Sequence, residues 1–80
     1  MVELNRAAAL AEAGQVEAAL SLVDGLELDQ YHYLHVTRAE LLRRLDRIDE
    51  AGTAYRRALS LVHSPAERRF LERRLTELRR

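Results

Sequence analysis

The sequence predicts an all-α protein made of two stacked helix hairpins and a fifth helix that closes the stack. Apolar residues recur at intervals of three and four along five segments, which is the spacing of one helix face. No segment alternates apolar and polar residues as a half-buried strand does. The chain also resembles itself at an offset of 32 residues (Arg6 to Arg38), and such periods are typical of stacked supersecondary units.

The repeat keeps its phase across two helices and the turn between them. Identities are few, but small residues fall on small residues and apolar on apolar, and Gly14 falls on Asp46, which is also a turn-forming residue. The other matched pairs are Arg6 with Arg38, Ala7 with Ala39, Leu10 with Leu42, Val16 with Ile48, Glu17 with Asp49, and Ala19 with Ala51. Each copy is therefore expected to form one helix hairpin.

The first hairpin is expected over residues 3–25. Its first helix covers 3–13, Gly14 makes the turn, and its second helix covers 16–25. Gly25 is expected to end the second helix, because glycine is favoured just past a helix C-terminus. The apolar stripe of the second helix consists of Val16, Ala19, Leu20 and Val23.

The second hairpin is expected over residues 30–62, with helices at 30–45 and 47–62. Asp29 is placed to cap the first of these helices and Asp46 the second, because an Asp side chain accepts hydrogen bonds from the free N–H groups of a first turn. The two apolar stripes consist of Tyr31, Leu34, Leu41, Leu42 and Leu45, and of Ile48, Ala51, Tyr55, Ala58, Leu59 and Val62.

A fifth helix is expected over residues 65–79. Ser64 can serve as its N-cap, with Pro65 at the first helical position and Glu67 three residues after the cap, which together form a capping box. The helix is expected to pack through Phe70, Leu71 and Leu75. One apolar face after the last hairpin is what a helical stack needs to close its open end, so residues 1–80 are interpreted as a single domain.

Composition excludes several classes of protein. Eighty residues form one small domain, and the absence of cysteine excludes disulfides and thiolate nucleophiles. The longest apolar run, Ala7–Ala11, is far shorter than the roughly 20 residues of a membrane span. No basic segment followed by an apolar one begins the chain, so no secretory signal is predicted. A cytoplasmic protein without membrane contact is expected.

The charges are balanced in total but separated along the chain. All 13 basic residues are arginine and are matched by 13 acidic residues. Residues 1–30 hold one arginine and six acids, whereas residues 31–80 hold twelve arginines and seven acids. Most arginine doublets lie three or four residues from an acid, which is typical of a solvated helix face, so no direct nucleic-acid binding is expected.

No constellation of residues predicts a metal site or catalysis. Asp29, His32 and His35 follow one another at intervals of three and would share one helix face, which makes a metal site conceivable. Capping by Asp29 and partly buried histidines are the favoured interpretation, because no fourth ligand is near. No nucleophile and base are set out together and no phosphate-binding loop is present, so we expect neither an enzyme nor a cofactor.

Small residues in both helices of each copy resemble the tetratricopeptide (TPR) hairpin. The positions that carry this resemblance are Ala7 and Ala39, Ala19 and Ala51, and Tyr55 followed by Ala58, although the usual Trp and Gly of the first helix are missing. The resemblance implies two TPR-like hairpins stacked in a right-handed superhelix. It also implies a protein–protein interaction domain.

A second resemblance covers nearly the whole chain. The strings VELNRAAALAEAG, LELDQYHYLHVTRAELLRRLDR, AYRRALSLV and SPAERRFLERRLTEL, in that order, resemble the C-terminal TPR-like extension of certain ECF-type RNA polymerase sigma factors. This implies a regulatory domain that modulates transcription initiation through contacts with the sigma-factor core domains or RNA polymerase. The promoter-reading domains are absent from these 80 residues, which leaves open whether they are an excised fragment. The alternative is a free-standing TPR-like adaptor with an unrelated partner.

Arg6 and Arg38 are candidate structural residues. They are equivalent in the repeat, and Arg38 lies between Leu34 and Leu41 on the packing stripe of its helix. An arginine at such a position must extend its charge to water or find an acceptor. We expect each to meet a carboxylate or a backbone carbonyl from a neighbouring helix or loop, with a partner-binding role as the alternative.

The candidate partner-binding residues lie on the first helix of each hairpin, which lines the concave side of a TPR-like stack. Tyr33 lies off the core stripe, and an exposed tyrosine beside arginine is typical of interface anchors. The full set is Glu12, Tyr33, Glu40, Arg43 and Arg44. The identity of the partner, the direction of regulation and self-association are left open by the sequence.

Overall fold

A computed structural model describes the backbone of residues 2–78 and the side chains of residues 4–78. Over that range the chain is all-helical and has no strand. The helices are α1 (Val2–Glu12), α2 (Val16–Asp24), α3 (His32–Arg44), α4 (Ile48–Leu61) and α5 (Pro65–Leu78). The all-α class and the five helices predicted from the sequence are confirmed, with ends that differ by one or two residues. Residue 79 of the predicted fifth helix lies outside the described residues.

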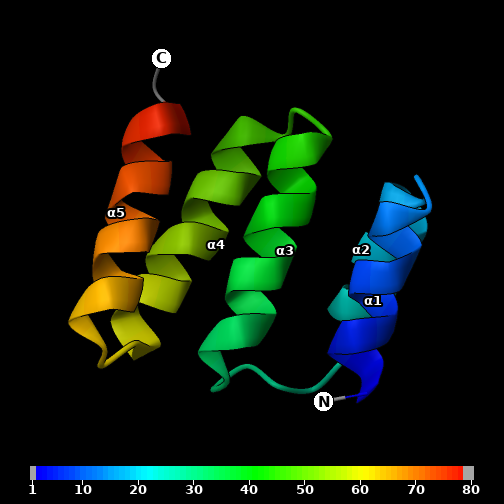
Figure 1. Cartoon of the computed structure of the whole chain (residues 1–80), viewed down its shortest axis with the longest axis horizontal. Coiled ribbons are helices and arrows are strands. Elements are labelled where there is room, and N and C mark those ends of the chain that lie inside the picture. Colours follow the sequence, from blue (N-terminus) through cyan, green and yellow to red (C-terminus); the bar gives the residue numbers. More distant parts are fainter. Residues whose placement is uncertain (1, 79–80) are drawn as a thin grey trace.

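The helices form a row rather than a bundle around one axis. In Figure 1, α1 and α2 lie together at one end of the row, α3 and α4 in the middle and α5 at the other end. The overall extents are 28 × 27 × 17 Å. Helices α1, α3 and α5 run in the same direction, whereas α2 and α4 return, and α1 is drawn in front of α2. None of the helices described for residues 2–78 is both long and apolar enough to cross a bilayer.

The two hairpin turns share one backbone geometry, which makes the repeat structural as well as sequential. Gly14 and Asp46 both take left-handed conformations, with φ of 86° and 59°. Each turn closes with the same pair of hydrogen bonds, as in a Schellman motif. These bonds are Gln15 N to Leu10 O and Gly14 N to Ala11 O in the first turn, and Arg47 N to Leu42 O and Asp46 N to Arg43 O in the second. Every partner in the second turn lies at the offset of the sequence repeat.

Two of the predicted helix caps need correction. Asp46 does not cap α4, because it ends α3 in the left-handed conformation that Asp tolerates better than most residues, and Arg47 precedes α4 without a side-chain cap. Asp29 does not cap α3, which starts later, at His32. Gly25 ends α2 as predicted, although with φ of −84° its backbone is right-handed rather than left-handed.

The start of α5 agrees better with the prediction from the sequence. Pro65 is its first residue, and the backbone N–H of Glu67 lies 3.4 Å from Ser64 Oγ, which is a long capping hydrogen bond. The Glu67 carboxylate does not return to the cap, as a capping box would require, because it instead contacts His32 at 2.8 Å.

The core depends on small residues at equivalent positions in the two hairpins. Ala7, Ala39, Ala19 and Ala51 are all completely buried, which lets the helices approach closely. The largest fully buried side chains are Tyr55, Leu42, Leu71 and Val23. No charged residue is buried among residues 4–78, so the core of the described chain is apolar apart from the phenol of Tyr55.

The packing of α5 differs from the prediction. Leu71 is buried and Leu75 is half-buried, as expected, but the Phe70 side chain is 39% exposed. Neighbouring residues on a helix point about 100° apart, so Phe70 and Leu71 cannot both face α4. Leu71 joins the core, and Phe70 lies on the flank of α5 that faces α3. The prediction that Phe70 packs in the core was therefore wrong.

Candidate protein-binding surface

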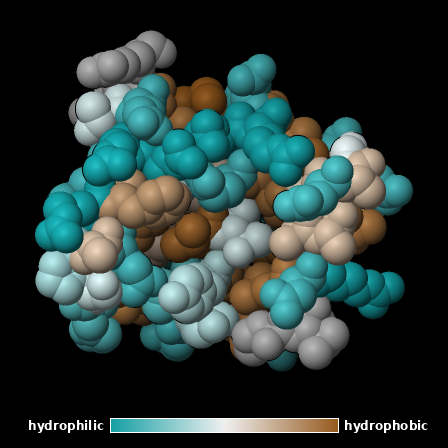
Figure 2. All heavy atoms as spheres, in the orientation of Figure 1, coloured by the Kyte–Doolittle hydropathy of each residue, from teal (hydrophilic) through white to brown (hydrophobic). Residues whose placement is uncertain are grey.

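A shallow apolar groove lies between α3 and α5. It has a volume of about 310 Å³, and its lining residues are Tyr33, Val36, Ala66, Glu67, Phe70 and Leu71. Tyr33 and Phe70 are two of the three large hydrophobic side chains that the described chain exposes; the third, Ile48, lies on α4. Figure 2 shows apolar side chains gathered in a hollow on this face, with polar side chains around it. Two exposed aromatic side chains in one groove are typical of a binding site.

One end of the groove is closed by a contact between α3 and α5. His32 Nε2 and Glu67 Oε2 are 2.8 Å apart, and this contact joins the N-terminal turns of the two helices. The negative charge of Glu67 raises the pKa of the Tyr33 phenol above its ordinary value. A tyrosine phenol is protonated at neutral pH even without this shift, so the Tyr33 hydroxyl can donate a hydrogen bond to a partner.

The other end of the groove is bounded by a cluster that joins three helices. Glu40 of α3 accepts a hydrogen bond from the Tyr55 hydroxyl of α4 and another, of 3.4 Å, from Arg74 Nη2 of α5. Glu40 Oε2 is also 3.5 Å from Arg43 Nε. Burial, together with the Glu40 carboxylate, raises the pKa of Tyr55. The carboxylate of Glu40 is thus used within the fold, and two arginines share it.

The structure divides the five candidate partner-binding residues into two groups. Tyr33, Glu40 and Arg43 lie on the side of α3 next to α5. Glu40 and Arg43 contact each other within the cluster, whereas Tyr33 lies outside it. Glu12 and Arg44 are exposed near the boundary of α1 and α3, where Arg44 Nη2 donates a 3.2 Å hydrogen bond to the carbonyl of Ala11. The binding face suggested by the sequence therefore continues across α3 onto α5.

Sequence reasoning missed the contribution of α5 to this surface. Phe70 and Val36 line the groove, and the Arg74 guanidinium lies over the Phe70 ring at 5.2 Å from its centroid. The sequence signal for this contribution was that Phe70 and Leu71 are adjacent apolar residues. Adjacent side chains on a helix point about 100° apart, so a single narrow apolar stripe can bury only one of them. That pattern indicates a second apolar flank on α5, but it does not say which helix faces it.

Arg38 meets the kind of partner that was expected, whereas Arg6 does not. Arg38 Nε donates a 2.7 Å hydrogen bond to Asp24 Oδ1 at the end of α2. Arg6 is exposed and forms no hydrogen bond or ion pair with residues 4–78, so the contact predicted for it is wrong within that range. The reason is positional: Arg38 reaches back to the helix that precedes its hairpin, and among the described residues no helix precedes α1.

Arg38→Ala is expected to lower the free energy of unfolding by only about 0.5–1 kcal/mol, as for other exposed ion pairs. The Arg38 and Asp24 side chains are 29% and 47% exposed, so the large effect of breaking a buried pair does not apply. Urea unfolding checks this, with Arg57→Ala as the matched control because Arg57 donates a single 3.3 Å bond to the carbonyl of Asp29. A loss above about 2 kcal/mol for Arg38→Ala alone would contradict the expectation.

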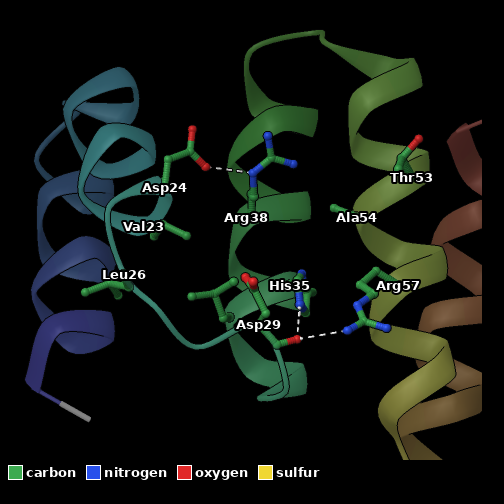
Figure 3. A pocket seen from close by; sticks show the side chains of 10 residues that line it. Val23, Asp24, Leu26, Asp29, His35, Arg38, Thr53, Ala54 and Arg57 are labelled. Atoms are coloured by element: carbon green, nitrogen blue, oxygen red, sulfur yellow. Dashed lines mark hydrogen bonds and ion pairs between the residues drawn. The ribbon is translucent and has the colours of Figure 1, made fainter.

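A second pocket, of about 410 Å³, lies between α2, α3 and α4 and contains the Arg38 ion pair. Figure 3 shows that Arg38 bonds to Asp24 in this pocket, and that His35 and Arg57 both bond to the carbonyl of Asp29. The carbonyl of Asp29 accepts hydrogen bonds from His35 Nε2 at 2.8 Å and from Arg57. These two bonds connect the loop between α2 and α3 to α3 and to α4. His32 and His35 therefore bond to different partners, and no group of three potential metal ligands occurs in the described chain.

Comparison with known proteins identifies a longer relative of this chain. No family model matches the chain, and no solved structure matches it. An uncharacterized protein of Rhizobium meliloti (strain 1021) is 39% identical over 80 residues, which cover 98% of this chain. The chain spans only 19% of the length of that relative. The sequence of all five helices is thus matched within one part of a much longer protein.

Proposed function

We propose that this domain is a non-enzymatic protein-interaction module that binds a partner on the face formed by α1, α3 and α5. The observation that carries the proposal is the groove in which Tyr33 and Phe70 remain 48% and 39% exposed. Exposed aromatic side chains that line one hollow bury a large apolar area when a partner enters it, and such residues dominate binding energy at interfaces.

We further propose that the helices form a TPR-like, right-handed stack. The identical turns at Gly14 and Asp46 and the equivalent buried alanines support this arrangement. In such a stack α5 occupies the place of the first helix of a third unit, and it runs in the same direction as α1 and α3 (Figure 1). The first helices of the units line the concave side, which is the side that carries the groove.

Within this class, we propose that the domain is the regulatory C-terminal extension of an ECF-type sigma factor. In this role it acts in the cytoplasm and modulates transcription initiation through the sigma-factor core domains or RNA polymerase. The four segments that carry the sequence resemblance extend over all five helices. The Rhizobium meliloti relative supports a domain attached to a larger chain, because the matching region is only 19% of its length.

The test is transcription in vitro by core RNA polymerase with the full-length protein that carries this domain. Phe70→Ser is expected to change the amount of transcript about fivefold or more, because removing an interface anchor costs more than 1 kcal/mol of binding. Ile48→Ser is the matched control, since Ile48 is 38% exposed but lies away from the groove. Equal transcript from both variants and the unaltered protein would refute the sigma-factor role. An unrelated partner captured through Phe70 would then favour the free-standing adaptor.

A further inference from the structure

The two exposed aromatic side chains of the groove belong to helices whose backbones have little direct contact. α3 and α5 both pack on α4 rather than on each other. An exposed side chain can rotate between its staggered conformations, and it loses that freedom when a partner covers it. Whatever holds the rings of Tyr33 and Phe70 in place before binding therefore affects how tightly the groove binds.

The Phe70 ring lies against Arg74, which is one turn further along α5. The guanidinium carbon is 5.2 Å from the ring centroid, within the range of a cation–π contact. The same guanidinium reaches α3, where Arg74 Nε is 3.3 Å from Glu40 Oε2 and Nη2 donates a 3.4 Å hydrogen bond to Glu40 Oε1. Glu40 is held in turn by the hydroxyl of the buried Tyr55. The support of Phe70 is thus anchored on the opposite wall of the groove.

The Tyr33 ring is supported in the same way, with the two helices exchanged. Its centroid is 4.1 Å from that of the His32 ring, and the two planes are inclined by 37°. His32 Nε2 is 2.8 Å from Glu67 Oε2 of α5, so this support is also anchored on the opposite wall. Each aromatic side chain therefore lies against a residue of its own helix that bonds to the other helix.

We propose that His32 and Arg74 are positioning residues, which hold the rings of Tyr33 and Phe70 in place before a partner binds. The role in binding rests on the proposed function, whereas the restraint on the rings does not. A neighbour on the same helix that is free at its far end moves with the ring, but these two supports are fixed to a second helix. Rings that are already ordered lower the entropy cost of forming an interface.

NMR spectroscopy of the 80-residue chain tests the restraint without any partner. In the unaltered chain, three-bond couplings should report a single χ1 rotamer for Phe70 and for Tyr33. Arg74→Ala should average the χ1 angle of Phe70 and leave Tyr33 fixed, and His32→Ala should do the reverse. Arg74→Lys should average Phe70 only in part, because lysine keeps a charge near Glu40 but not a planar group over the ring. If Arg74→Ala does not fold, Arg74→Lys provides the comparison.

Matched variants separate an anchored support from the loss of any side chain of the same type. Arg73→Ala and His63→Ala each remove an exposed residue, so both rings should stay fixed. Glu77→Ala removes the partner of Arg74 on α5 itself and leaves the bond to α3, so Phe70 should again keep one rotamer.

Transcription in vitro with the full-length protein that carries this domain measures the role in binding. Arg74→Ala should change the amount of transcript about two- to fivefold, in the direction of Phe70→Ser, as expected when one interface side chain loses its order. The double variant should match Phe70→Ser alone, because a residue that acts through Phe70 has no effect once that ring is absent.

Three results would overturn the inference. These are a single χ1 rotamer of Phe70 that persists in Arg74→Ala, averaging that is already present in the unaltered chain, and additive effects on transcription, which would mean that Arg74 contacts the partner itself. The proposed function fails separately, when transcription does not respond to Phe70→Ser although both rings respond to the variants as expected. A response to Phe70→Ser with rings that the variants leave fixed would show that only the positioning role is wrong.

Discussion

Removal of residues 64–80 is expected to leave a chain that is largely unfolded or aggregated at room temperature. The deletion removes Leu71, which is 1% exposed, and the half-buried Leu75 and Leu78 that pack against the core. Truncation of one buried leucine alone typically costs about 2–5 kcal/mol. A domain of 80 residues has a total stability of only about 4–12 kcal/mol. The loss of the whole helix is therefore expected to remove most or all of that free energy of unfolding.

Circular dichroism and sedimentation of residues 1–63 measure this outcome. Two full-length variants provide a graded control: Leu71→Ala should melt well below the unaltered chain, and Phe70→Ser should melt close to it, because Phe70 is 39% exposed. A truncated chain that remains monomeric, with unchanged helicity per residue and an unchanged melting temperature, would show that α5 is not a terminal cap.

The helices and their turns could be predicted because local sequence determines them. Apolar spacing identifies a helix face from within the segment itself, whatever the segment packs against. The match of Gly14 with Asp46 indicated two equivalent turns, and both residues have left-handed backbones. The cap assigned to Asp46 was wrong because one residue cannot both end α3 in that conformation and cap α4.

The binding surface could be predicted only in part, because it depends on how separate helices meet. The sequence places Tyr33 off the core stripe, and its exposure follows from that position alone. The exposure of Phe70 depends on the direction from which α4 covers α5, which decides between Phe70 and Leu71. The burial of the Arg38 pair likewise depends on how closely α2 approaches α3, and the approach leaves Asp24 47% exposed.

Glu40 is the clearest case of a role that no local pattern reveals. In the sequence it is one acid among arginines on an amphipathic helix, and a partner-facing position is a reasonable interpretation. In the fold its carboxylate contacts residues of both α4 and α5, including the hydroxyl of the fully buried Tyr55. The contact with Tyr55 spans 15 residues of sequence and that with Arg74 spans 34, so only the tertiary structure brings the three together.

Glu40→Ala is expected to lower the free energy of unfolding by about 2–3 kcal/mol. The change leaves the Tyr55 hydroxyl without its acceptor in a buried position, and an unsatisfied buried group costs about 1–3 kcal/mol. It also leaves Arg43 and Arg74 without the carboxylate between them, a smaller term because the Glu40 side chain is 29% exposed. For a domain of this size the melting temperature should fall by about 10–20 °C.

Two further variants separate this role from loss of an ordinary surface charge. Glu77→Ala removes another partner of Arg74, but Glu77 is 46% exposed, so the expected loss is within about 0.5 kcal/mol. In the Glu40→Ala background, Tyr55→Phe should restore stability, because it removes the hydroxyl that has lost its acceptor, whereas in the unaltered chain the same change should destabilise by about 1 kcal/mol. The measurement is a double-mutant cycle by urea unfolding. If the two changes are additive, or if Glu40→Ala costs no more than Glu77→Ala, then Glu40 is a surface residue and its carboxylate is available to a partner after all.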